Sequence, residues 1–225
     1  MARPKPLVRW LMPVIRAGLH WLYTRGAWAY DAVAWLVSGG HWQDWVRSMA
    51  LWPEAQEGTW VLELGVGPGH LQVQLAELGF RPVGVDPSPY MLRRARRRLR
   101  RAGHRPCLVR ARAQVLPFPP ERFHRVVATF PTEYVFDART VEEVWRVLKP
   151  GGRFDILLSA SGWLLTRWER WLGGDEHAQE MELYRSFRPA ARLGALVYIR
   201  RYPLPHGAWG WVVTLYKPAQ LEDVP

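Results

Sequence analysis

The feature that most constrains the fold is a glycine-rich turn between an apolar run and a helical pattern. The run from Trp60 to Leu64 is short and apolar, as in a buried strand, and Gly65, Gly67 and Gly69 follow it directly. Leucines then recur at helical spacing, at Leu71, Leu75 and Leu78. Glycines at a strand-to-helix turn let the backbone bend tightly and let a ligand approach where a Cβ would collide. The pattern therefore predicts a strand, a ligand-binding turn and a helix, in that order.

The acidic residues near the turn indicate which kind of ligand it accepts. Asp86 ends the next apolar run, 21 positions after Gly65, where a carboxylate can accept hydrogen bonds from ribose hydroxyls. A dinucleotide fingerprint would need its third glycine at His70 or Gln72, and no Gly-Lys-Ser/Thr follows the turn as a P-loop requires. The carboxylate of Glu63 would repel a pyrophosphate but suits a ligand with a positive centre. The spacing therefore predicts a nucleoside site of another kind.

From residue 60 onward, short β-branched runs alternate with helical periods, as in a parallel sheet wound by crossover helices. We predict strands over residues 60–64, 83–86, 108–111, 125–129, 154–158, 195–202 and 211–216, the last two as an antiparallel hairpin. Thr140 and Glu143 form a candidate capping box for a helix that Pro150-Gly151-Gly152 ends. The expected fold is α/β, a doubly wound, mostly parallel, Rossmann-like sheet of seven strands within residues 56–225.

Residues 1–55 are a separate, tryptophan-rich region with a helical pattern. Arg9 and Arg16 lie near one face of its first helix, Pro13 is expected to kink that helix or delay its start, and apolar residues occupy the other face (Leu7, Trp10, Leu11, Val14, Ile15, Leu19 and Leu22). We predict a helical lid on the sheet. A basic helix with tryptophan is also typical of an interfacial anchor, so peripheral membrane contact is the alternative.

The net charge, the single cysteine and the apolar runs indicate which partners and which location to expect. The formal net charge of +11 favours anionic partners. Seven arginines lie within Arg93 to Arg101, and the apolar residues between them predict one amphipathic helix, whose guanidinium groups face water or dock a polyanion. The single Cys107 excludes an internal disulfide and a thiolate zinc cluster, and we expect no metal site. No run suits a membrane-spanning helix or a signal peptide, so we expect a cytoplasmic protein.

Four segments, in this order, resemble motifs of class I S-adenosylmethionine-dependent methyltransferases. They are Glu63-Leu64-Gly65-Val66-Gly67-Pro68-Gly69, Val85-Asp86-Pro87-Ser88-Pro89-Tyr90-Met91-Leu92, Leu116-Pro117-Phe118 and Arg146-Val147-Leu148-Lys149-Pro150-Gly151-Gly152-Arg153. The resemblance covers roughly residues 58 to 160 and is greatest for the small-molecule branch that includes quinone-precursor and phospholipid methylases. It implies S-adenosylmethionine as the cofactor and methyl transfer as the activity.

The resemblance also implies roles for single residues. Gly65, Gly67 and Gly69 would admit the methionine moiety, with Glu63 near its amino group. Further along the chain, Asp86 would hold the ribose hydroxyls, Pro87 would also contact the cofactor, Met91 would cover the adenine, and Ala113 would lie beside it. One departure concerns the adenine: the family often has an acid where Arg112 stands, and a guanidinium offers no acceptor. Gln114 or a backbone carbonyl would then have to substitute.

The acceptor side is expected beyond the predicted strand 125–129, because ligands in such sheets bind outside the carboxyl ends of strands. Glu133 is the candidate base and Tyr134 is expected to stack on the acceptor, although Thr132 and Glu133 also suit the start of a helix. Further candidate bases are His41, His70 and His206. We expect aromatic walls from the N-terminal helices, from residues 130–134, and from Trp163, Trp168, Trp171 and Tyr184.

Three functions fit the sequence. A methyltransferase for a small aromatic or lipid-like acceptor fits the aromatic residues. An RNA methyltransferase would use the arginine helix, but Phe130-Pro131-Thr132-Glu133 stands where enzymes that methylate exocyclic amines have an Asn/Asp-Pro-Pro-aromatic loop. The third is a binding module for S-adenosylmethionine without activity.

Overall fold

The computed structural model describes residues 38–50, 57–161 and 176–219. The chain divides into two compact units, residues 1–42 and 43–225. In the first unit, the backbone N–H of Trp42 donates to Oγ of Ser38 at 3.0 Å. The predicted lid over residues 1–55 lies mostly outside the described residues and stays a prediction. No helix in the described ranges has the length and apolar character to cross a bilayer.

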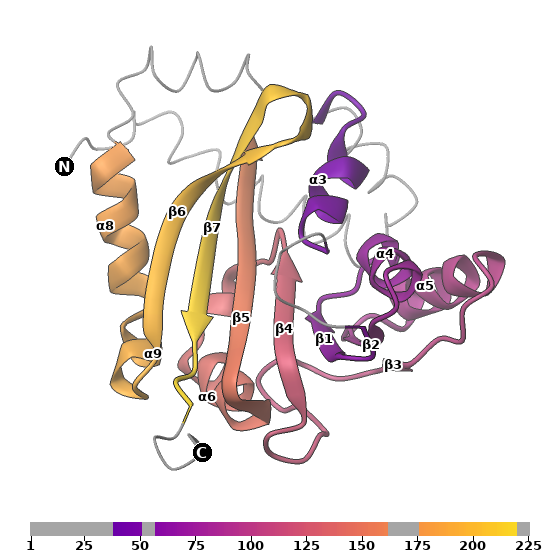
Figure 1. Ribbon diagram of the computed structural model, residues 1–225, viewed down its shortest axis with the longest axis horizontal. Coiled ribbons are helices and arrows are strands. Elements are labelled where there is room, and N and C mark those ends of the chain that lie inside the picture. Colours follow the sequence, from indigo (N-terminus) through magenta and orange to yellow (C-terminus); the bar gives the residue numbers. More distant parts are fainter. Residues whose placement is uncertain (1–37, 51–56, 162–175, 220–225) are drawn as a thin grey trace. The chain divides into compact units, whose positions relative to one another are not determined.

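Among the described residues, seven strands form one sheet, as predicted, in the order β3-β2-β1-β4-β5-β7-β6 (Figure 1). Neighbouring strands are parallel except that β7 runs antiparallel to both β5 and β6. The predicted C-terminal hairpin is therefore present. The strands are β1 (Trp60–Leu64), β2 (Arg81–Val85), β3 (Leu108–Val109), β4 (Phe123–Thr129), β5 (Leu148–Ser161), β6 (Leu196–Leu204) and β7 (Ala208–Tyr216).

Helices connect and cover the strands, which makes the sheet doubly wound. They are α3 (Trp42–Ser48), α4 (His70–Glu77), α5 (Pro89–Arg101), α6 (Ala138–Val147), α8 (Glu176–Ser186) and α9 (Arg188–Arg192), with short 3₁₀ turns η1 (Glu133–Phe136) and η2 (Pro205–Gly207). Side chains alternate along a strand, so Leu62 and Leu64 point to one face of β1 and Glu63 to the other.

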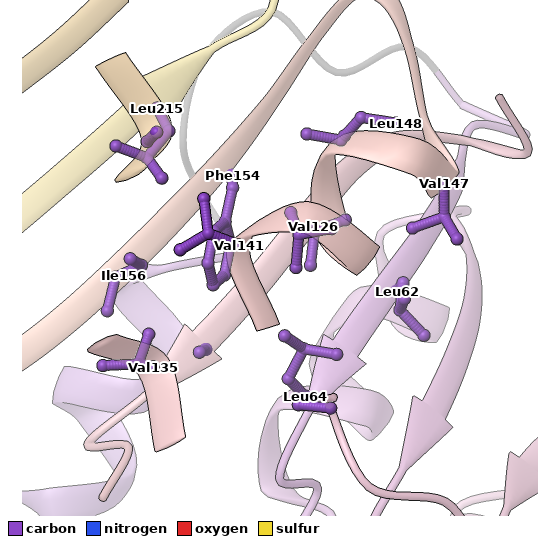
Figure 2. Packing of buried hydrophobic residues seen from close by; sticks show 14 of the residues in the cluster. Leu62, Leu64, Val126, Val135, Val141, Val147, Leu148, Phe154, Ile156 and Leu215 are labelled. Carbon is purple, nitrogen blue, oxygen red and sulfur yellow. The ribbon is translucent and has the colours of Figure 1, made fainter. Parts of the chain in front are cut away.

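The main core lies between the sheet and helices α6 and α9 (Figure 2). Strands β1, β4, β5 and β7 contribute apolar side chains to it, including Leu62, Val126, Phe154, Ile156 and Leu215. Helix α6 contributes every third residue (Val141, Val144 and Val147), which is a spacing that keeps side chains on one helix face. This packing fixes the carboxyl ends of β1, β4 and β5 relative to one another.

The opposite face of the sheet carries a buried charge cluster. Nε of Arg125 on β4 and Nε of Arg153 on β5 donate to Oδ2 of Asp155 at 2.7 and 3.0 Å. The hydroxyl of Thr214 on β7 donates to Oδ1 of the same carboxylate at 2.9 Å. Nη2 of Arg125 also donates to the carbonyl oxygen of Met49, just after α3, at 2.7 Å. The cluster therefore joins three strands to the segment that precedes them in the chain.

Two local predictions were wrong. Helix α6 begins at Ala138, and its cap is Asp137, whose Oδ1 accepts from the N–H of Arg139 at 3.0 Å, so the capping box at Thr140 is not formed. Glu143 instead accepts from the N–H of Leu116 at 2.6 Å. Strand β5 was predicted to begin at Phe154 but begins at Leu148, before the Pro150-Gly151-Gly152 segment. That segment lies within the strand as a bulge, where the register between β4 and β5 shifts.

Candidate functional site

The turn between β1 and α4 has the backbone conformation that its glycines permit. Gly65, Gly67 and Gly69 have φ of 72°, 52° and 84°, in the left-handed region that disfavours other residues. The N–H of Gly65 donates to the carbonyl oxygen of Val85 at 2.9 Å, which holds the turn against the end of β2. A Cβ on Gly69 would lie 2.8 Å from Ala95, so Gly69 also lets α5 pack against the turn.

Asp86 ties the two loops of the site together. One carboxylate oxygen accepts from the N–H of Gly67 at 3.0 Å and the other accepts from the N–H of Ser88 at 2.8 Å. The side chain is 0% exposed. Asp86, the residue predicted to bind the ribose, is therefore a carboxylate that backbone N–H groups hold in place. It lies where β1 and β2 both end.

Glu63 is a second buried carboxyl group, 2% exposed, on the face of β1 that α4 covers. Its Oε2 accepts from Nε2 of Gln72 at 2.8 Å. Burial raises the pKa of Glu63 from 4.5 to about 8, the bond from Gln72 opposes that rise, and the charge of Asp86 adds to it. The carboxyl is therefore mostly protonated at neutral pH, and a cation nearby would favour its ionised form. No sequence pattern predicts the bond to Gln72, because it depends on how α4 is rotated over β1.

Tyr134 connects the acceptor side of the site to the glycine turn. Its hydroxyl donates to the carbonyl oxygen of Leu64 at 3.1 Å, and a Cβ on Gly65 would lie 2.9 Å from the same hydroxyl oxygen. The expected stacking of Tyr134 on an acceptor stays a prediction. Glu133 is exposed at the first position of η1, and the side chain of Thr132 makes no capping bond there.

The predicted adenine contacts lie on α5 and on the loop after β3. Met91 is fully buried, and Ala113 belongs to the main core. Pro87 is exposed, and its carbonyl oxygen accepts from Nε of Arg110 at 3.3 Å. Arg112 is exposed, whereas Gln114 is half-buried and donates from Nε2 to Asp137 at 3.3 Å. Of these two, Gln114 is the side chain with an acceptor to offer to an adenine amino group.

The remaining candidate groups have side-chain partners of their own, lie in the first unit or fall outside the described ranges. Nδ1 of His70 is 2.7 Å from Nη1 of Arg98, and Nε2 of His206 is 2.9 Å from Oδ2 of Asp44. His41 lies in the first unit, before α3. Trp163, Trp168 and Trp171 fall outside the described residues, and Tyr184 is exposed on α8.

Sequence reasoning missed two features at the carboxyl edge of the sheet. Phe130 directly follows β4 with φ of 48°, a strained conformation for an aromatic residue, and such strain clusters at functional sites. On β7, Trp211 pairs with Ser159 and Trp209 with Ser161, so both tryptophans lie beside the carboxyl end of β5. The tryptophans were visible in the sequence, but only the hairpin register places them there.

The described residues fit S-adenosylmethionine. The three left-handed glycines keep Cβ atoms out of the turn, where a ligand must approach the backbone. The fixed carboxylate of Asp86 suits hydroxyl donors of a ribose. Glu63, whose raised pKa reflects the cost of burying its charge, suits a cationic group.

Comparisons with known proteins agree with this geometry. Residues 61–152 match the family described as methyltransferase domain. A demethylmenaquinone methyltransferase from Symbiobacterium thermophilum is 35% identical over 147 residues, which are 62% of this chain and 58% of that protein. A ubiquinone/menaquinone biosynthesis C-methyltransferase from Blochmanniella floridana is 30% identical over 134 residues, 57% of this chain and 53% of that protein. The chain thus spans between half and two thirds of the length of these relatives.

Solved structures agree in fold. A SAM-dependent methyltransferase from Aquifex aeolicus superposes with a TM-score of 0.59 at 17% identity, covering 82% of this chain and 97% of that one. The matched residues 61–152 run from the first strand, through the glycine turn and Asp86, to the bulge of β5. Through that match, the fold and the arrangement of Glu63, Gly67 and Asp86, residues 61–152 of the chain are similar to the methyltransferase domain family.

Proposed function

We propose that this protein transfers a methyl group from S-adenosylmethionine to a small, apolar aromatic or lipid-like acceptor of the quinone-precursor type. The observation that carries the proposal is the junction of three segments. The glycine turn after β1, Asp86 after β2 and Tyr134 after β4 meet through the bonds from Gly67 to Asp86 and from Tyr134 to Leu64. A cofactor side and an acceptor side therefore share one edge of the sheet.

When bound, S-adenosylmethionine supplies a methyl group on a sulfonium, which already has a good leaving group. The main task of the chain is then to hold the acceptor, the methyl group and the sulfur in line. The backbone of Gly65 and Gly67 and the carboxylate of Asp86 would position the donor. Tyr134 would fix the carbonyl of Leu64, which lies next to Gly65.

Aromatic side chains on this edge support an apolar acceptor. Phe130 and Tyr134 follow β4, and Trp209 and Trp211 begin β7 beside the end of β5. Planar rings of this kind suit a flat aromatic ligand. The curated relatives quoted above are named for demethylmenaquinone and for ubiquinone and menaquinone biosynthesis, which agrees with such an acceptor.

A base is needed where the acceptor atom carries a proton. In that case a bond forms between the acceptor atom and the methyl carbon, the bond between methyl and sulfur breaks, and the acceptor proton leaves. We assign the proton to the carboxylate of Glu133, because it is exposed at the start of η1, next to Tyr134.

The test uses the purified full-length chain with a donor carrying a tritiated methyl group. A demethylated naphthoquinol with a short side chain, transfer RNA and phospholipid vesicles are offered separately. We expect label in the extracted quinol, and none from Asp86→Asn. Glu142→Gln, which removes an exposed charge on α6, should keep wild-type turnover. Label in RNA would replace this proposal with an RNA methyltransferase, and donor binding without label in any pool would replace it with a binding module.

A further inference from the structure

One segment of the chain concentrates positive charge without any negative charge. Residues 87–120 contain no Asp or Glu and ten arginines: Arg93, Arg94, Arg96, Arg97, Arg98, Arg100, Arg101, Arg105, Arg110 and Arg112. The segment forms α5, the edge strand β3 and the loops around them. In Figure 1, α5 and β3 lie at the opposite end of the sheet from β6.

Helix α5 separates its apolar and basic residues cleanly. Met91, Leu92, Ala95 and Leu99 are buried. Seven arginines of the segment are exposed, four on α5 (Arg93, Arg97, Arg100 and Arg101) and three in the flanking residues (Arg105, Arg110 and Arg112). We call these seven residues the basic edge.

The charge of the basic edge is not neutralised within the described part of the chain. Other arginines there have acidic partners: Arg125 with Asp155 at 2.7 Å, and Arg146 with Glu143 at 2.7 Å. None of the seven arginines forms an ion pair with an acid of the described ranges. Like charges this close together repel, and an anionic surface would relieve that repulsion.

Apolar side chains accompany the basic edge. Tyr90, at the start of α5, is 37% exposed, and Val115, three residues after Arg112, is 72% exposed. Basic side chains beside exposed apolar groups are typical of contact with a membrane interface. Single-stranded nucleic acid would instead need open aromatic faces for its bases, and the ring of Tyr90 already has the guanidinium of Arg93 at 5.8 Å from its centroid.

We propose that the basic edge docks the protein on an anionic lipid bilayer. The inference rests on the proposed function in one respect: a lipid-soluble acceptor resides in such a bilayer. Helix α5 begins directly after Asp86 and Ser88, so docking would place the bilayer next to the loops that bind the cofactor. The surface is distinct from the predicted N-terminal helix, which lies outside the described residues.

The test is co-sedimentation of the full-length chain with vesicles of phosphatidylcholine alone or with about 30 mol% phosphatidylglycerol. We compare the wild type with the triple variant Arg97→Gln, Arg100→Gln, Arg101→Gln. The matched control is Arg185→Gln, Arg188→Gln, Arg192→Gln, which removes three exposed arginines from α8 and α9. Thermal melts establish that both variants fold.

We expect wild-type binding to the anionic vesicles alone, and loss of that binding at about 0.5 M salt. The triple variant at the basic edge should bind about tenfold more weakly or less, while the control stays within about twofold of wild type. Equal losses in both variants, or wild-type binding to neutral vesicles, would overturn the proposal. Tighter binding to transfer RNA than to vesicles, lost in the same variant, would replace the bilayer with RNA.

Turnover of a soluble short-chain quinol separates this inference from the proposed function. The triple variant should keep wild-type turnover of that acceptor in the absence of vesicles, because Arg97, Arg100 and Arg101 are not among the residues assigned to the site. If the wild type fails to methylate the quinol but still binds anionic vesicles, the proposed acceptor is wrong and the docking surface stands.

Discussion

The hydroxyl of Tyr134 donates to the carbonyl oxygen of Leu64 at 3.1 Å, across 70 positions of the chain. This bond fixes the carbonyl next to Gly65, the first glycine of the glycine turn. Tyr134→Phe should therefore weaken S-adenosylmethionine binding by roughly threefold to tenfold, since a single hydrogen bond contributes about 0.5–1.5 kcal/mol. Calorimetric titration measures the change, and Tyr184→Phe on α8 is the control. If Tyr134→Phe binds S-adenosylmethionine as tightly as the wild type, the bond to Leu64 does not shape the glycine turn.

Gly65 and Tyr134 should be energetically coupled. Gly65 has φ of 72°, and an added Cβ would lie 2.9 Å from the Tyr134 hydroxyl oxygen but 3.8 Å from its ring carbon Cζ. Gly65→Ala should thus lower the free energy of unfolding more in the wild type than in a Tyr134→Phe background. Urea denaturation of the double-mutant cycle measures the coupling, which we expect to be about 1 kcal/mol.

The control for that cycle is Gly103→Ala. Gly103 has a similar φ of 81°, but nothing lies within 4 Å of its added Cβ. It therefore reports backbone strain alone, roughly 1 kcal/mol, and should show no coupling to Tyr134→Phe. Equal costs for Gly65→Ala and Gly103→Ala in the wild type would contradict the proposed clash.

Stability should depend on pH through Glu63. Burial raises its pKa from 4.5 to about 8, so the folded state binds a proton that the unfolded state has released over this range. The stabilisation that the protonated Glu63 adds to the free energy of unfolding is fully present below about pH 4.5. It is lost as the pH rises through about 8. Between these limits the free energy of unfolding should fall by about 1.4 kcal/mol per pH unit from this group.

Glu63→Gln keeps the shape of the side chain but does not titrate. Urea denaturation at a series of pH values should therefore give a smaller decline between pH 5 and pH 8 for this variant than for the wild type. Parallel curves for the two proteins would show that Glu63 keeps an ordinary pKa in the folded state. Glu142→Gln is the control, because Glu142 is exposed and its removal should leave the wild-type slope.

The fold was predictable from the sequence because its determinants are local. Apolar runs, helical spacing and the glycine turn placed β1, β2 and α5 to within a few residues, and the spacing to Asp86 placed the acid at the end of β2. The start of α6 was wrong because Asp137 and Thr140 are both good caps, and only packing selects between them. Helix caps of similar quality are a recurrent source of such shifts.

The buried polar contacts were not predictable, because they depend on how separate elements pack against one another. The bond from Gln72 to Glu63 depends on the rotation of α4 over β1. The pairing of Arg125 with Asp155 depends on the register between β4 and β5, which includes a bulge. In a strand pattern, a charged residue is predicted to face solvent. Whether it is buried depends on which face of the sheet the neighbouring elements cover.

The buried pair of Arg125 and Asp155 should be a large determinant of stability. Their side chains are 3% and 0% exposed, and without Arg125 the carboxylate of Asp155 keeps the ion pair with Arg153 and the bond from Thr214. Arg125→Met should lower the free energy of unfolding by roughly 1.5–3 kcal/mol, the range for a hydrogen bond to a charged group. It also removes the bond to the Met49 carbonyl, which joins α3 to the sheet.

Urea denaturation measures this loss, and Arg139→Met is the matched control. Arg139 pairs with Asp137 at 3.0 Å, but its side chain is 74% exposed, so its removal should change stability little. Similar losses in the two variants would contradict a special role for the buried cluster. A triple variant Arg125→Met, Arg153→Met, Asp155→Leu should recover part of the loss, because it removes all three charged groups of the cluster together.

Glu133 gives the sharpest test of the proton transfer. If its carboxylate takes up the proton that leaves the methyl acceptor, Glu133→Gln should lower kcat on the quinol by about 10²-fold or more. The affinity for S-adenosylmethionine should stay unchanged. Glu133→Asp should recover part of the rate, because it restores a carboxylate. Turnover of Glu133→Gln within a few-fold of wild type would exclude Glu133 as the base. The same assay on Glu142→Gln controls for the loss of a negative charge, and since that residue is on α6, a fall in its kcat would point to long-range electrostatics instead.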